Sequence, residues 1–199
     1  MTAVDGMKLV LATRNPGKLR EFNRLLSPAS VAVVPLREDV QLPPEDGSTF
    51  ADNALPKART AAKATGRVAI ADDSGIEAAA LGGRPGVRSA RFAGVGASDQ
   101  ENLDKLLCEA PAGSGLRYVC ALAYVDPVGG VEEVFCGACS GRLAEEPRGT
   151  GGFGYDPAFL PDGEYGGRTM AELSDAEKDA ISHRGMAVLE LLAWLHRPR

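Results

Sequence analysis

The chain has 199 residues, of which 44% are hydrophobic and 25% are charged, and its formal net charge is −5. This composition is typical of a soluble globular protein of one domain, which can have two lobes. The acidic balance argues against bulk attraction to nucleic acid or to an anionic membrane. No run is long enough for a membrane span, and the first residues do not resemble a signal peptide. We therefore expect a cytoplasmic protein that binds neither nucleic acid nor membranes.

The sequence contains four cysteines, and nothing around them predicts a disulfide or a metal site. In a protein without a secretory signal, we expect reduced thiols. Two of them form a single CxxC pattern in a predicted strand, where residues three apart face opposite sides and suit one metal ion poorly. We therefore interpret all four as core cysteines: Cys108, Cys120, Cys136 and Cys139.

A predicted strand over residues 8–13 leads through the polar segment 13–18, TRNPGK, into a helix with Leu19 and Phe22 at helical spacing. A loop that opens a helix can bind an anion through its backbone N–H groups and the helix dipole. Lys18 lies in the first turn, where a lysine is unfavourable unless an anion offsets it. The alternative is an ordinary strand–helix turn with an exposed lysine, and this segment alone does not decide between the two.

A predicted strand over 30–36 and a polar loop precede a predicted helix over 50–65. The pattern Thr49-x-x-Asp52 resembles a capping box at the start of this helix. Pro56 lies inside it, and we expect a kink there, since proline costs a helix interior roughly 3 kcal/mol relative to alanine.

The short apolar run at 68–71 is typical of a buried strand, and two adjacent carboxylates, Asp72 and Asp73, follow it. Because side chains alternate along a strand, these carboxylates should face opposite sides. One can then face a site while the other holds the turn that we predict at Ser74-Gly75. The alternative is that both carboxylates bond only the backbone of this turn.

Glycines and arginines follow the two carboxylates. Glycines let a backbone approach a ligand closely, and arginines suit a polyanion. Mg²⁺ is usually held by one or two carboxylates together with substrate phosphates, so this stretch indicates Mg²⁺ and phosphate binding. The residues are Gly82, Gly83, Arg84, Gly86, Arg88 and Arg91.

The second half of the chain predicts a helix from Ser98 to about Ala110, a hairpin, a glycine-rich loop and two further helices. The loop over 148–157 carries two aromatic side chains and a carboxylate, and it is either a ligand loop or a surface loop with a core aromatic. A histidine such as His183 is more often a structural hydrogen-bonding residue than a ligand. The hairpin strands are 117–126 and 131–143, a capping box at 174–177 opens one helix, and the last helix follows 181–185.

Five segments, taken in order, resemble the inosine triphosphate pyrophosphatase family, which hydrolyses noncanonical purine nucleoside triphosphates. The resemblance implies an α/β fold with an elongated mixed β-sheet flanked by helices. It also implies one domain over 1–199 with two lobes and a central nucleotide-binding cleft, a homodimer, and Mg²⁺-dependent cleavage to the monophosphate and pyrophosphate. The segments are TRNPGK (13–18), FADNALPKAR (50–59), ADDSGIEAAALGGRPGVRSARFAG (71–94), GTGGFGYDPAF (149–159) and ELSDAEKDAISHRG (172–185).

The resemblance also implies roles for individual residues. Asp73 matches the catalytic carboxylate, and Glu45 and Asp73 match metal ligands. Two positions depart from the family pattern, Pro56 and Asp52. The implied substrate-binding residues are Thr13, Arg14, Asn15, Pro16, Gly17, Lys18, Lys57, Ser74, Phe153, Gly154, Tyr155, Asp156, Lys178, His183 and Arg184.

These roles predict a mechanism in which Asp73 activates a water that attacks the α-phosphorus, while Lys18 and Lys57 stabilise the departing pyrophosphate. Arg184, with His183, would read the 6-oxo group of hypoxanthine or xanthine, because arginine only donates hydrogen bonds. Two alternatives are a pyrophosphatase of the same fold acting on other modified nucleotides, and a nucleotide-binding protein without turnover. A nucleic-acid-binding protein is disfavoured by the net charge.

Overall fold

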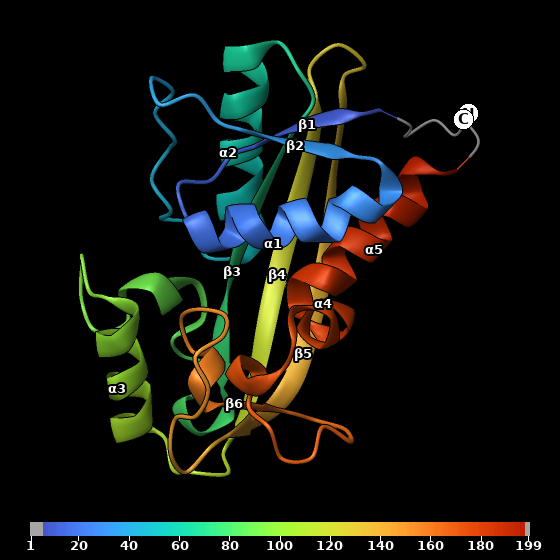
Figure 1. Cartoon of the computed structure of the whole chain (residues 1–199). Helices are drawn as coiled ribbons and strands as arrows, with labels where there is room; N and C mark the ends of the chain where they lie inside the picture. Colours follow the sequence, from blue (N-terminus) through green and yellow to red (C-terminus); the bar gives the residue numbers. More distant parts are fainter. Residues whose placement is uncertain (1–5, 198–199) are drawn as a thin grey trace. The chain divides into compact units, whose positions relative to one another are not determined.

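The computed structural model describes residues 6–197, which form a six-stranded sheet flanked by helices (Figure 1). The strand order is β2-β1-β3-β4-β5-β6. β1 pairs in parallel with β2 and β3, whereas β5 and β6 are antiparallel, so the predicted mixed α/β sheet is confirmed. The strands are β1 (Lys8–Leu11), β2 (Ala32–Pro35), β3 (Ala69–Ala78), β4 (Gly115–Asp126), β5 (Val131–Leu143) and β6 (Phe159–Pro161).

Most of the helices begin at capping residues that can be recognised in the sequence. Capping boxes open α2, α3 and α4 at Thr49, Ser98 and Ser174, as predicted. Asn15 caps α1 by accepting hydrogen bonds from the N–H groups of the first turn. The helices are α1 (Pro16–Leu26), α2 (Phe50–Thr65), α3 (Asp99–Glu109), α4 (Asp175–Ile181) and α5 (His183–Leu195), with 3-10 turns at Ser27–Ala29, Ala79–Leu81, Gly86–Arg91, Asp156–Ala158 and Met170–Glu172.

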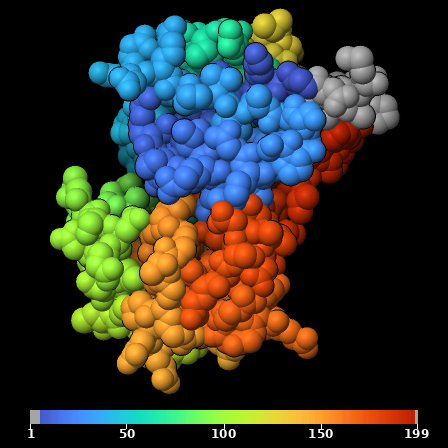
Figure 2. All heavy atoms as spheres, in the orientation of Figure 1, coloured from blue at the N-terminus to red at the C-terminus, as the bar shows by residue number. Residues whose placement is uncertain are grey.

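The chain divides into two compact units. Unit 1 comprises the residues up to Asp73, Cys120–Gly137 and the residues from Arg184 onwards. Its α1 and β2 segments, blue in Figure 2, form one closely packed surface on the face shown. Apolar side chains of β1, α1, β3, β4 and α5 contribute to its core, which includes Leu9, Leu11, Phe22, Leu26, Ile70, Leu122, Val188 and Leu191.

Unit 2 comprises Ser74–Val119 and Ala138–His183. It has a core of its own, to which α3 contributes the apolar face predicted from its leucine spacing. The core includes Ile76, Leu103, Leu106, Leu116, Tyr118, Leu143, Phe159 and Met170. In the described residues of both units, no helix combines the length and the apolar character that crossing a membrane requires.

The turn that we predicted at Ser74-Gly75 is wrong, because β3 continues through both residues to Ala78. Gly75 instead allows the segment of Gly86 and Ser89 to pack closely against β3. A Cβ at this position would lie 2.4 Å from Ser89 Oγ and 2.5 Å from the carbonyl oxygen of Gly86. The sequence shows that a glycine is present but not which segment packs against it.

α2 continues as one helix through Pro56, as its predicted range expects. One further expectation changes with the structure. The interpretation of all four cysteines as core residues is wrong for Cys108 and Cys136, which are exposed, whereas Cys120 and Cys139 are buried. Cys108 lies outside the buried face of α3, and Cys136 follows buried Phe135 on β5 and therefore points to the other side.

Candidate active site

The segment between β1 and α1 is held by its own polar groups. Asn15 Oδ1 accepts hydrogen bonds from the N–H groups of Gly17, at 2.8 Å, and Lys18, at 3.1 Å. The N–H of Asn15 in turn donates to Thr13 Oγ1 at 3.1 Å. Arg14 donates to four carbonyl oxygens between Leu36 and Val40 and so anchors the loop after β2. Asn15 thus already accepts from two N–H groups of the predicted phosphate segment. The Arg14 guanidinium is bound to carbonyl oxygens, so the Lys18 ammonium is the other cationic group of this segment.

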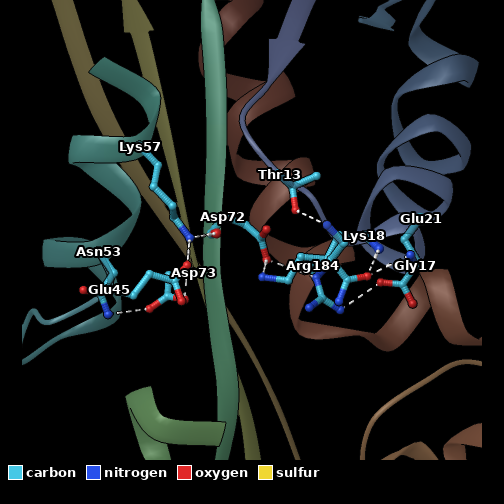
Figure 3. Close-up of polar contacts among 11 residues, drawn as sticks. Thr13, Gly17, Lys18, Glu21, Glu45, Asn53, Lys57, Asp72, Asp73 and Arg184 are labelled. Atoms are coloured by element: carbon cyan, nitrogen blue, oxygen red, sulfur yellow. Dashed lines mark hydrogen bonds and ion pairs between the residues drawn. The ribbon is translucent and has the colours of Figure 1, made fainter. Parts of the chain in front are cut away.

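Asp72 lies at the centre of a buried ionic cluster (Figure 3). Its Oδ2 is 3.0 Å from Lys18 Nζ and accepts a hydrogen bond from Arg184 Nε at 3.2 Å. Arg184 also donates through Nη1 to Glu21 Oε2 at 2.9 Å. Burial alone would raise the pKa of Asp72, but the nearby cations, Lys18 first, outweigh it and hold this pKa well below its ordinary value. Asp72 therefore stays ionised and orients the two cations.

Asp73 faces the opposite side of β3, which confirms the predicted alternation (Figure 3). Its Oδ2 accepts a hydrogen bond from Asn53 Nδ2 at 2.8 Å, and its Oδ1 lies 3.8 Å from Lys57 Nζ. Burial raises the pKa of Asp73 and the Glu45 charge adds to this, outweighing Lys57 and the Asn53 hydrogen bond. A carboxylate with a raised pKa is a stronger proton acceptor than an ordinary aspartate.

Lys57 is almost fully buried between acidic groups. Its Nζ donates to Glu45 Oε1 and, at 2.8 Å, to the carbonyl oxygen of Asp72. Burial alone would lower the pKa of Lys57, but the surrounding carboxylates, Asp72 first, raise it. Lys57 therefore remains a fixed positive charge beside Asp73.

The carboxylates of Glu45 and Asp73 both approach the Lys57 ammonium, so they are gathered around one cationic position. Carboxylate oxygens are the ligands that Mg²⁺ prefers, and one or two of them suffice when substrate phosphates complete the shell. Within residues 6–197, no three or more His, Cys, Asp or Glu side chains form a metal-binding group. This pair of acids therefore fits a magnesium ion bound together with a substrate better than an all-protein metal cage.

A second cluster of predicted site residues lies within unit 2. Asp156 is buried, and its Oδ2 accepts hydrogen bonds from Lys178 Nζ at 2.6 Å and from the N–H of Phe153 at 2.9 Å. Lys178 Nζ is also 5.3 Å from the centroid of the Phe153 ring. Tyr118, which we did not predict, donates to Asp156 Oδ1 at 3.1 Å and stacks on the ring of His183.

The glycine-rich loop of this cluster makes close approaches. A Cβ at Gly152 would lie 2.0 Å from Asp156 Oδ2, so only glycine lets the loop fold over that carboxylate. The N–H of Gly154 donates to Asp99 Oδ2 at 3.0 Å, and Tyr155 Oη donates to the carbonyl of Ser89 at 2.8 Å. Ser89 in turn bonds the N–H of Ile76, next to the Ser74-Gly75 pair. The loop is thus packed against its surroundings, with Tyr155 in the core of unit 2. These contacts fit a surface loop with a core aromatic as well as a ligand loop.

The predicted site residues are divided between the two units, and those of unit 1 lie on both sides of β3 (Figure 3). Those at Lys18, Lys57, Asp73 and Arg184 lie in unit 1 and those at Phe153, Asp156, Lys178 and His183 in unit 2. Sequence reasoning did not assign roles to Glu21, Ser89 or Tyr118. Polar residues on predicted helices and strands look like solvated surface, and only the three-dimensional contacts reveal their partners.

The mixed α/β sheet carries two buried carboxylates on β3, each near a lysine ammonium, and such groups could bind a metal ion together with phosphates. The chain belongs to the Ham1 family, which it matches over residues 9–194. It is 50% identical over 192 residues to a protein of Symbiobacterium thermophilum named dITP/XTP pyrophosphatase, covering 94% of each chain. It is also 50% identical over 197 residues to a protein of that name from Mycobacterium tuberculosis, covering 94% of this chain and 95% of the relative.

Solved structures agree with this membership. A HAM1 protein from Coxiella burnetii superimposes with a TM-score of 0.82 at 41% identity, covering 95% of this chain and 98% of that one. A nucleoside-triphosphatase (dITP/XTP pyrophosphatase) from Mycobacterium abscessus superimposes with a TM-score of 0.71 at 45% identity, covering 94% and 99%. The fold and the family predicted from the five segments are therefore confirmed.

Proposed function

We propose that this protein hydrolyses noncanonical purine nucleoside triphosphates, ITP, dITP and XTP, to the monophosphate and pyrophosphate. The observation that carries the proposal is that full-length relatives at half identity are named dITP/XTP pyrophosphatase. The ionic groups around Asp72 and Asp73 support it, because they supply the charges that a triphosphate needs. Such an enzyme removes abnormal nucleotides from the precursor pool.

The proton acceptor in this proposal is Asp73. Its burial and raised pKa suit a group that takes a proton from water. The water would attack the α-phosphorus, so the bond to the β-phosphate oxygen breaks and pyrophosphate leaves with that oxygen. Lys57, held beside Asp73 by its carboxylate contacts, would stabilise the charge that develops on the phosphates.

The lysine of the α1 segment acts on the phosphate tail. Asp72 holds the Lys18 ammonium in place and is itself held by Arg184. A lysine fixed in this way loses little side-chain freedom when it meets a phosphate, which favours tight binding. Pyrophosphate would then leave beside the Lys18 ammonium, which is already in position.

Mg²⁺ is part of the proposal, with Glu45 and Asp73 as the residues that would hold it. When bound, Mg²⁺ supplies positive charge that neutralises the triphosphate and helps to orient it. Both carboxylates contact the Lys57 ammonium and therefore lie close together, and the support for the ion is this proximity with the preference of Mg²⁺ for carboxylate and phosphate oxygens. Metal-free enzyme in a chelator should release pyrophosphate at a small fraction of the rate seen with added magnesium.

The unit 2 cluster is the proposed nucleoside-binding group. The ring of Phe153 offers a stacking face that is tolerant of base identity, so it adds affinity without selecting a base. Lys178 is held by Asp156 and can donate to an acceptor such as the 6-oxo group of hypoxanthine. Adenine presents a donor at this position, and a buried unmatched donor costs roughly 1–3 kcal/mol.

The proposal is tested by a pyrophosphate-release panel over ITP, dITP, XTP and the four standard ribonucleoside triphosphates, with a coupled pyrophosphatase. We expect release from the first three to exceed release from ATP by a factor of hundreds or more. Release from ITP, dITP and XTP no faster than from the standard nucleotides would instead support the alternative pyrophosphatase, acting on another modified nucleotide. Nucleotide binding without any release would support the non-catalytic alternative.

The remaining parts of the proposal concern assembly and location. We propose a homodimer in the cytoplasm with no nucleic-acid partner. Light scattering at micromolar concentration should therefore give a mass near twice that of the 20.8 kDa chain. A mass near one chain would refute the dimer without affecting the proposed reaction.

A further inference from the structure

Asn53 makes two hydrogen bonds in opposite directions, and Figure 3 shows the one to Asp73. Its Nδ2 donates to Asp73 Oδ2 at 2.8 Å, and its Oδ1 accepts from the N–H of Gly47 at 2.8 Å. Its exposed fraction is 2%. A single buried amide therefore connects α2, on which it stands, with β3 and with the loop before α2.

The loop that Asn53 contacts carries Glu45, two residues before Gly47. The packing there is close, since a Cβ at Gly47 would lie 2.7 Å from Asn53 Oδ1 and 2.5 Å from the Cβ of Asp52. Any larger residue at position 47 would push the loop away from the helix. Asn53 thus links the Glu45 loop to the Asp73 carboxylate.

The Asn53 hydrogen bond is the short, directional contact of the Asp73 carboxylate. The charged groups that act on this carboxylate are Lys57 of α2, Glu45 of the preceding loop and Lys18 of α1. Of these, Lys57 Nζ lies 3.8 Å from Oδ1, which is beyond hydrogen-bond distance. An ion pair at that distance attracts the carboxylate without fixing its rotation, whereas the amide fixes Oδ2.

We propose that Asn53 is a positioning residue that sets the orientation of the Asp73 carboxylate and ties it to the Glu45 loop. The inference rests on the proposed function, in which Asp73 takes a proton from water. Only an amide suits both bonds, because it offers a donor and an acceptor side by side. Aspartate would keep the acceptor for Gly47 but lose the donor, and leucine would lose both.

The test compares Asn53→Asp and Asn53→Leu with a matched control, Asn102→Asp. Asn102 is equally buried, at 2% exposed, and its amide also bridges two groups, accepting from Ala93 N–H at 2.8 Å and donating to the Ala90 carbonyl at 3.3 Å. All three variants should lower the unfolding temperature. A structural role alone would make the catalytic effects of the three variants similar.

Positioning instead predicts that kcat for ITP falls about 10–100-fold in both Asn53 variants, while KM stays within about threefold. The kcat of Asn102→Asp should stay within about threefold of the wild-type value. If either Asn53 variant keeps wild-type kcat at a temperature where it is folded, the proposal is wrong. A loss in Asn53→Asp alone would mean that added charge, not lost orientation, slows the reaction.

A swap tests the contact without measuring activity. In Asn53→Asp, two carboxylates face each other, so the unfolding temperature should fall most. Adding Asp73→Asn restores a donor facing an acceptor, and the double variant should regain much of the lost unfolding temperature. No recovery would refute the direct contact. If the wild-type enzyme releases pyrophosphate from no nucleotide, the proposed function fails, whereas the swap still tests the contact.

Discussion

Arg184 provides the sharpest test of how the Asp72 side of the site is built. Its guanidinium donates to Asp72 Oδ2 at 3.2 Å and to Glu21 Oε2 at 2.9 Å, and all three residues are buried. With Lys18, the cluster contains two cations and two carboxylates. Arg184→Met keeps most of the apolar stem but removes one of the two cations.

The loss of free energy of unfolding should be large. Removing one partner of a buried ion pair typically costs about 3–5 kcal/mol, because it leaves a buried charge uncompensated. We therefore expect Arg184→Met to lower the free energy of unfolding by about this amount. Adding Glu21→Leu should recover part of the loss, because it also removes the carboxylate that no longer faces the guanidinium.

Urea unfolding measures the effect, with the fluorescence of the single tryptophan, Trp194, as the signal. Trp194 packs in unit 1 at 5.1 Å from Tyr124, ring centre to ring centre. Arg59→Met is the matched control, because Arg59 also forms a bidentate pair, with Glu132, but half of its side chain is exposed. Exposed pairs contribute at most about 1 kcal/mol. Equal and small losses of free energy of unfolding in Arg184→Met and Arg59→Met would refute the prediction that the buried cluster stabilises the fold.

The same variant separates two roles of Arg184. If Arg184 contacts the base, as the sequence predicted, Arg184→Met should lower the ratio of the activity on ITP to the activity on ATP. Because Nε and Nη1 donate to carboxylates in the structure, we expect both activities to fall together and the ratio to hold within about threefold. A large fall in the ITP/ATP activity ratio would instead support a role for Arg184 in binding the base.

Three further predictions test other contacts. Lys18→Ala should weaken triphosphate binding about tenfold or more and monophosphate binding much less, as measured by calorimetry, and equal losses would contradict the phosphate role. Gly47→Ala should lower kcat as the Asn53 variants do, since it separates the loop from Asn53, and a wild-type kcat would argue against that link. Hydrogen bonds from Arg168, with those from Ser174, lower the pKa of Glu177 from 4.5 to about 2. In urea unfolding, Glu177→Gln should therefore be less stable than wild type above pH 4.5, and this difference in free energy of unfolding should disappear as the pH falls from 4.5 towards 2. A difference that does not change with pH would refute the role of these hydrogen bonds.

Features that depend on a few neighbouring residues could be predicted from the sequence. The capping boxes at Thr49, Ser98 and Ser174 lie where their patterns predict. The alternation that sends Asp72 and Asp73 to opposite sides of β3 also follows from strand geometry alone. Such signals need no knowledge of the tertiary structure, and neither did the five segments that identified the family.

Features that depend on distant partners could not be predicted. Asn53 meets a carboxylate 20 residues away, and Glu21 meets a guanidinium 163 residues away. On their helices, both residues look like members of a solvated face. Gly75 was interpreted as a turn residue because the sequence does not reveal that Ser89 packs against it. In each case the missing information is the identity of the packing partner.

The central claim is that Asp73 accepts the proton in the hydrolysis of noncanonical purine nucleoside triphosphates, and Asp73→Asn tests it most directly. The amide keeps the shape of the side chain and can still accept the hydrogen bond of Asn53, but it cannot take up a proton at neutral pH. Pyrophosphate release from ITP should fall by about 10²-fold or more, while ITP affinity, measured by calorimetry, stays nearly unchanged. Turnover of ITP close to the wild-type rate in this variant would contradict the account.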